Sequence, residues 1–254
     1  MIELIVWCIL GLGGWWWLLR RAPPAGCVSA DRWRPGDGIT IGLLALYVVF
    51  GLFAESDPSK KVTGELLRAE SGMYLMIASL VLVRAATRTP MTFFGLVPRN
   101  PARVIAIGVA CIAMTYPLVL LAEKVAELLK FSASEGDGMV QFLRGPLTVS
   151  DRCWAAVLAL MIAPITEELV FRGYAYGVIK KYGGRVAATL GSALLFAALH
   201  QNLPALPALF LLAVGFALAY EFTGSLWTSI VMHMIFNLVP LIVILFFPEW
   251  ISKF

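Results

Sequence analysis

Eight long apolar runs, separated by short polar segments, follow one another along the 254-residue chain. A helix needs roughly 20 apolar residues to cross the hydrocarbon core of a bilayer, and several of these runs approach that length. Because the backbone finds no water to bond in hydrocarbon, we predict an all-α, polytopic membrane protein with about eight transmembrane helices, one of which could be re-entrant. The predicted helices are Ile2–Leu19, Ile39–Ala54, Met73–Ala86, Val104–Leu121, Trp154–Ile179, Val186–His200, Ala205–Tyr220 and Thr228–Phe247.

The composition points to the same class. Hydrophobic residues make up 60% of the chain and charged residues only 14%, which excludes an ordinary soluble domain and a disordered chain. The net charge of +4 comes from Lys and Arg in the short loops, as expected of cytoplasmic loops that face anionic lipid. We see no basic patch for nucleic acid. The expected location is an integral, multi-pass position in a lipid bilayer, which is the cell membrane if the protein is bacterial.

Turn-forming residues predict where the helices end. Clusters of Gly, Pro, Asp and Lys lie at residues 34–38, 57–61, 98–101, 134–138 and 183–184, and such clusters favour turns. No internal repeat and no low-complexity linker divides the chain. We therefore predict one structural domain overall.

Ionisable side chains inside the apolar runs are the candidate functional residues. Glu167 and Glu168 are adjacent in one run, and the only two histidines, His200 and His233, lie in two others. Such groups are costly in hydrocarbon and therefore mark a site. Neighbours on a helix point about 100° apart, which predicts separate roles for the two carboxylates. Glu168 can pair with Arg172 four residues later, whereas Glu167 has no local partner and is the candidate general base.

Simple helix geometry brings these residues to one depth. Glu167 lies 13 residues before Lys180, and His200 lies 15 residues after Arg185, so each is roughly 20 Å from the same membrane side. In the last run, His233 and Asn237 are four residues apart on one helix face. We therefore predict that four polar groups on three helices converge on one buried pocket.

Other residues of these runs have structural interpretations. We interpret Glu168 and Arg172 mainly as a structural ion pair, and Phe196, four residues before His200, as a packing residue. Gly173 and Gly177 form a small-xxx-small face that predicts close helix packing.

The polar residues of the three runs resemble the motifs of the CPBP family of intramembrane proteases, also called the CAAX protease and bacteriocin-processing or Abi family. The match consists of Glu167-Glu168-x-x-x-Arg172, Phe196-x-x-x-His200 and His233-x-x-x-Asn237, in that order. The resemblance covers roughly Trp154 to Phe247. It implies a catalytic helical core at 151–254, preceded at 1–150 by membrane helices that carry no recognised motif.

The resemblance implies an intramembrane endopeptidase similar to the type II CAAX prenyl protease, which removes the last three residues after a prenylated cysteine. Glu167 and His200 would activate water, and His233 and Asn237 would form the oxyanion hole. Glu168, Arg172 and Phe196 would support them. The partner would be a peptide or a prenylated, membrane-associated protein, and the peptide bond would be cut near the membrane surface.

Alternatives to this interpretation concern a metal and the activity itself. Glu167, His200 and His233 could bind zinc, with water in the fourth position. However, His-x-x-x-Asn is not the metal-binding helix of zincins, and we favour a mechanism without a cofactor. A second hypothesis is a non-catalytic bacteriocin-immunity or membrane scaffold protein with the same fold. A third, a small transporter, lacks the expected pair of discontinuous helices.

Overall fold

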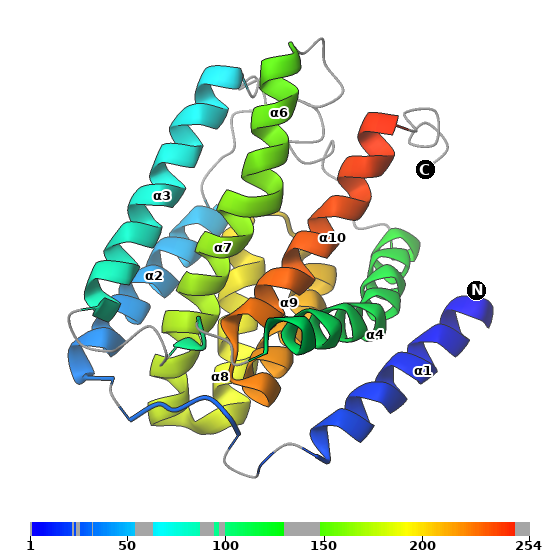
Figure 1. Cartoon of the computed structure of the whole chain (residues 1–254), viewed down its shortest axis with the longest axis horizontal. Helices are drawn as coiled ribbons and strands as arrows, with labels where there is room; N and C mark the ends of the chain where they lie inside the picture. Colours follow the sequence, from blue (N-terminus) through cyan, green and yellow to red (C-terminus); the bar gives the residue numbers. More distant parts are fainter. Residues whose placement is uncertain are drawn as a thin grey trace.

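The computed structural model describes residues 2–21, 23, 26–31, 33–53, 63–86, 94–96, 100–129 and 148–246. Every extended regular element within these ranges is a helix (Figure 1), and the all-α prediction is confirmed. The elements are α1 (Ile2–Leu19), α2 (Pro35–Phe53), α3 (Gly64–Ala86), α4 (Pro101–Leu128), α6 (Val149–Val157), η2 (Leu158–Ile162), α7 (Ala163–Glu168), η3 (Leu169–Tyr176), α8 (Gly177–Leu199), α9 (Leu206–Thr223) and α10 (Leu226–Phe246).

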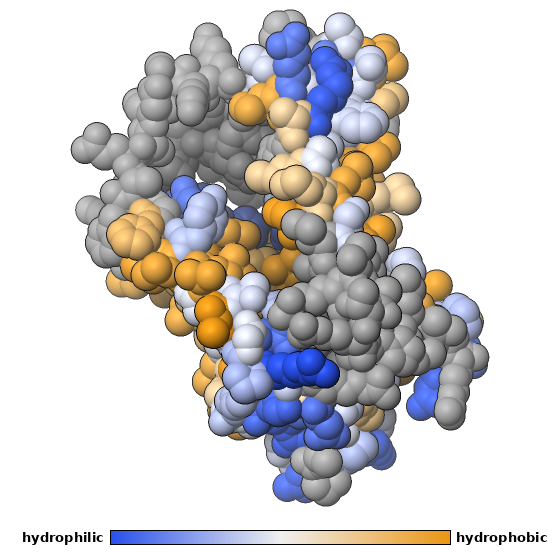
Figure 2. Space-filling model, turned by 90° about the vertical axis from the view of Figure 1, so that its left-hand side faces the viewer, coloured by the Kyte–Doolittle hydropathy of each residue, from blue (hydrophilic) through white to orange (hydrophobic). Residues whose placement is uncertain are grey.

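Five helical stretches of the described chain are long and apolar enough to cross a membrane. One of them, Val149–Leu199, contains two of the predicted runs, and α2 supplies a shorter apolar helix, Pro35–Phe50. Figure 2 shows hydrophobic side chains across the middle of one face and hydrophilic ones toward its upper and lower ends. The chain is an integral, multi-pass membrane protein. The other four stretches are Ile2–Leu19, Pro101–Leu128, Leu206–Thr223 and Leu226–Ile244.

Helix α9 lies at the centre of the bundle, where it packs against α4, α8 and α10. Helix α1 packs along α4 at the edge of the bundle (Figure 1). Trp15 of α1 donates from Nε1 to Thr115 Oγ1 at 3.2 Å, and Cys8 Sγ lies 3.2 Å from the carbonyl of Pro117. Helix α3 packs against α6, η2, α7 and η3, so it lies directly beside the helix that carries the two glutamates.

Two of the predicted breaks have different outcomes. Residues 35–38 were predicted to form a turn, but they are the first turn of α2. Proline is favoured at the first helical position, and the Asp37 carboxylate accepts a hydrogen bond from Arg34 N at 2.8 Å. At 183–184 the predicted break is confirmed, because Gly184 has a φ of 77° and reverses the chain inside α8. The breaks at 57–61 and 134–138 lie outside the described residues.

The small face of Gly173 and Gly177 permits close packing, as predicted, and its partners are aromatic side chains. A Cβ atom at Gly173 would lie 3.3 Å from Phe94 Cδ1, and one at Gly177 would lie 2.2 Å from Trp33 Nε1. Trp33 immediately precedes α2, and Trp33 and Phe94 also contact each other, with ring centroids 6.1 Å apart. These two glycines therefore let aromatic side chains pack directly on the backbone of η3 and α8.

We expect Gly177→Ala to lower the unfolding temperature of the purified protein in detergent. The new methyl group would overlap Trp33, and overpacking of this kind costs about 1–3 kcal/mol. Gly13→Ala in α1 is the matched control, because a Cβ atom there meets nothing within 4 Å. Equal unfolding temperatures for the two variants would contradict the packing described here.

Candidate active site

A single helical stretch from α6 to η3 carries the two glutamates, and it passes through π-helical turns on both sides of them. In η2, Ala163 N donates to the carbonyl of Leu158, five residues earlier. The next bond of this type would join residue 164 to Ala159, but Pro164 has no N–H. Asn237 of α10 supplies the missing donor, because its Nδ2 donates to the Ala159 carbonyl at 2.8 Å.

Glu167 and Glu168 are both buried, with exposed fractions of 7% and 0%. Glu167 Oε1 accepts a hydrogen bond from the Tyr74 hydroxyl of α3 at 3.0 Å. Glu168 Oε1 accepts one from Arg172 Nη1 at 2.9 Å. The Oε2 atom of each carboxylate is buried and accepts no hydrogen bond from any described residue. Buried carboxylate oxygens are normally satisfied, so these two atoms are unusual among the described residues.

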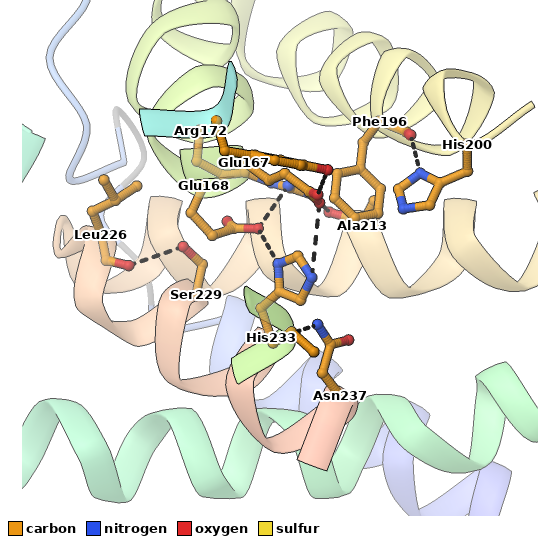
Figure 3. Close-up of polar contacts among 12 residues, drawn as sticks. Glu167, Glu168, Arg172, Phe196, His200, Ala213, Leu226, Ser229, His233 and Asn237 are labelled. Carbon is orange, nitrogen blue, oxygen red and sulfur yellow. Dashed lines mark hydrogen bonds and ion pairs between the residues drawn. The ribbon is translucent and has the colours of Figure 1, made fainter. Parts of the chain in front are cut away.

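The imidazole of His233 lies between the two carboxylates (Figure 3). Its Nδ1 is 3.2 Å from Glu168 Oε1, and its Nε2 is 3.9 Å from Glu167 Oε2. The sequence predicted separate environments for the two carboxylates, which is correct for Tyr74 and Arg172 but wrong for His233. The reason is that the two nitrogens lie on different edges of the ring, so one imidazole can face two carboxylates that point in different directions.

Arg172 completes the buried cluster and confirms the predicted pair with Glu168. Its side chain is fully buried, and Nη2 donates to the carbonyl of Ala213 in α9 at 3.0 Å. The guanidinium carbon also lies 4.7 Å from the ring centroid of Phe196 and 5.2 Å from that of Phe216. Hydrogen bonds and aromatic faces thus hold this cation beside Glu168.

His200 reaches the cluster through Phe196. The two rings are 4.8 Å apart, and Phe196 also contacts the ring of His233 at 5.7 Å. His200 Nδ1 lies 2.9 Å from the carbonyl of Phe196. A carbonyl can only accept, so in the neutral imidazole Nδ1 carries the hydrogen and Nε2 keeps its lone pair. His200 is exposed, unlike the other residues of the cluster, so this lone pair can meet water.

The structure therefore brings the four predicted catalytic residues together to different degrees. Glu167 and His233 approach each other directly, whereas His200 and Asn237 each bond to a backbone carbonyl. Among the described residues His200 forms no hydrogen bond or ion pair with Glu167. The same part of the chain contains no group of three His, Cys, Asp or Glu side chains placed to hold a metal ion.

Tyr74 is the residue of this site that the sequence did not reveal. It lies in α3, which was predicted to carry no motif, and its spacing to Glu167 is 93 residues. A tyrosine in an apolar run is equally typical of a membrane interface. Only the tertiary structure distinguishes it.

The helices that carry the two glutamates and the two histidines match a known protein family. Residues 149–239 match the family model described as type II CAAX prenyl endopeptidase Rce1-like. These residues are similar to the CAAX protease family, and the match covers less than half of the chain. This confirms the resemblance seen in the three motifs.

A curated relative in the CAAX protease family is the membrane-embedded CAAX protease MroQ of Staphylococcus aureus (strain USA300). The two chains are 37% identical over 101 residues, which cover 37% of this chain and 40% of the relative. The match thus spans less than half of the relative's length. No solved structure gives a significant match to the chain.

Proposed function

We propose that the protein is a membrane-embedded endopeptidase of the CAAX protease type, which hydrolyses a peptide bond of a prenylated or membrane-associated substrate near the membrane surface. The observation that carries the proposal is the imidazole of His233, which lies between the buried carboxylates of Glu167 and Glu168. A merely structural Glu168–Arg172 pair needs neither Glu167 nor a histidine at this position. The match to the family over the same helices adds independent support.

In the proposed reaction, Glu167 takes one proton from a water molecule, and His200 accepts a hydrogen bond from the other O–H of that water, which attacks the carbonyl carbon of the scissile peptide bond. The buried Glu167 Oε2 and the free Nε2 of His200 are the atoms available for this role. His233 Nε2–H and the second hydrogen of Asn237 Nδ2 donate to the oxyanion that forms. The proton then passes to the leaving nitrogen, the C–N bond breaks, and a carboxylate and an amine result.

The charges of the cluster suit an oxyanion donor at His233. Glu167 and Glu168 contribute two negative charges, and Arg172 contributes one positive charge. A proton on both nitrogens of His233 makes the four-residue cluster neutral, with Nδ1–H directed at Glu168. Buried charges are tolerated when they are paired in this way. Glu168 and Arg172 would therefore fix the orientation of His233.

The test is hydrolysis by the full chain in phosphatidylethanolamine and phosphatidylglycerol vesicles. Peptides that end in Cys-aliphatic-aliphatic-X, with and without a farnesyl group on the cysteine, are incubated with the protein and with His200→Ala. We expect mass spectrometry to detect release of the last three residues by the wild type only, before and after dialysis against a strong chelator. Failure of the wild type to cut any peptide in this panel would contradict the proposal and favour the scaffold hypothesis.

We expect Asn237→Ala to lower kcat by about 100-fold or more, because one lost oxyanion donor typically costs about 3 kcal/mol of barrier. The same change also removes the bond to the Ala159 carbonyl, so its structural effect must be measured separately. The control is Asn202→Ala, which removes an amide side chain that accepts from Ala205 N in a loop. An unchanged kcat in Asn237→Ala would exclude Asn237 from the oxyanion hole.

A further inference from the structure

The hydrogen bond between Tyr74 and Glu167 links the proposed general base to a helix outside the matched family region. Tyr74 lies in α3, whereas the match begins at residue 149. Its hydroxyl donates to Glu167 Oε1 at 3.0 Å. A hydroxyl that binds a carboxylate forms a charge-assisted hydrogen bond, which is stronger than a neutral one.

Two further contacts hold α3 in register beside the glutamates. Trp154 donates from Nε1 to Ser71 Oγ at 3.1 Å, and Thr166 Oγ1 lies 3.5 Å from the carbonyl of Tyr74. Both contacts connect α3 to the helical stretch that carries Glu167, and the second involves the residue next to it. Figure 1 shows α3 alongside α6 and α7. These contacts fix α3 against the helical stretch that carries Glu167, and they therefore hold the Tyr74 hydroxyl close to the Glu167 carboxylate.

The hydrogen bond from Tyr74 also orients the second carboxylate oxygen of Glu167, Oε2. With Oε1 bound to Tyr74, rotation of the carboxylate about its last side-chain bond is restrained, and Oε2 stays directed toward His233 Nε2, 3.9 Å away. Oε2 accepts no hydrogen bond from any described residue. One oxygen of Glu167 is thus tied to the protein and the other is left for the reaction. A fixed geometry of this kind is what general-base catalysis requires.

We propose that Tyr74 is a positioning residue that orients Glu167, so that α3 contributes to catalysis although it carries no family motif. This inference rests on the proposed function. The charged and titratable groups that the structure places around Glu167 are Glu168 and Arg172 on the same helix and His233 on α10.

The experiment compares Tyr74→Phe with Tyr47→Phe in the full chain in vesicles. Phenylalanine keeps the ring and removes only the hydroxyl, and Tyr47 is an exposed tyrosine of α2. We expect Tyr74→Phe to lower kcat about 10-fold with KM unchanged, because hydrogen bonds to charged groups are worth this factor or more. Tyr47→Phe should behave as the wild type in kcat and in KM.

A second measurement does not depend on activity. The infrared carboxylate band that is lost in Glu167→Gln should change its frequency in Tyr74→Phe and stay unchanged in Tyr47→Phe. An active wild type with an unaltered kcat and an unaltered band in Tyr74→Phe overturns this inference and leaves the proposed function standing. An inactive wild type whose band does respond to Tyr74→Phe rejects the proposed function and retains the contact. An unaltered band in an inactive protein rejects both.

Discussion

Glu167→Gln is expected to slow peptide hydrolysis by at least about 100-fold, because general acid–base catalysis typically contributes a factor of 10²–10⁴. Glutamine keeps the size of the side chain and can still accept a hydrogen bond from the Tyr74 hydroxyl. What it cannot do is take a proton from water. The measurement is kcat of the purified full chain in vesicles, with the peptide that the wild type cuts best.

Glu127→Gln is the matched control for this substitution. Glu127 is an exposed glutamate near the end of α4, where it pairs with Lys124 at 2.7 Å. The same loss of one negative charge at this position should leave kcat unchanged. If Glu167→Gln and Glu127→Gln had equal rates and equal unfolding temperatures, the carboxylate of Glu167 would have no part in the reaction.

Contacts within one helix could be predicted from the sequence. Glu168 and Arg172 are four residues apart, and this spacing alone places both side chains on one face. Close packing at Gly177 also follows from a local property, since a residue without a side chain leaves room above the helix, but the aromatic partner Trp33 was not predicted. The long apolar runs define the spanning helices for the same reason, because hydropathy is a property of each segment by itself.

Contacts between distant segments could not be predicted in this way. Depth estimates placed His200 at the level of Glu167, but they could not show which nitrogen of His233 faces which carboxylate. The sequence shows that Pro164 lacks an N–H, but it reveals neither the π-helical turn nor the bond from Asn237 to the Ala159 carbonyl. Tyr74 required the lateral arrangement of α3, which hydropathy does not contain.

The start of α2 could not be predicted from composition. Pro35 and the residues after it resemble a turn in composition, and the same residues are also typical of a helix start. Asp37 decides between them. It is buried at 2% exposure, and its Oδ1 accepts a hydrogen bond from the Tyr174 hydroxyl at 3.0 Å. A partner 137 residues away in the sequence therefore anchors a helix start that composition alone leaves undecided.

Arg172→Met is expected to lower the free energy of unfolding by about 3–5 kcal/mol, because it leaves the buried charge of Glu168 without its partner. Both side chains are 0% exposed, and Arg172 also loses its hydrogen bond to the Ala213 carbonyl. The measurement is equilibrium unfolding in mixed micelles with increasing denaturing detergent. An additional Glu168→Gln should recover much of the loss, since the double variant no longer buries a lone charge.

The exposed ion pair Arg68–Asp151 is the control that shows how much of the destabilisation is caused by burial of the charges. Its two charged atoms are 3.5 Å apart, and the Arg68 side chain is 51% exposed. Exposed pairs contribute roughly 0–1 kcal/mol, so Arg68→Met should have a small effect on unfolding. If Arg172→Met were no more destabilising than Arg68→Met, Glu168 would have to find another source of charge compensation. His233 is then the candidate, because its Nδ1 already lies 3.2 Å from the same carboxylate oxygen.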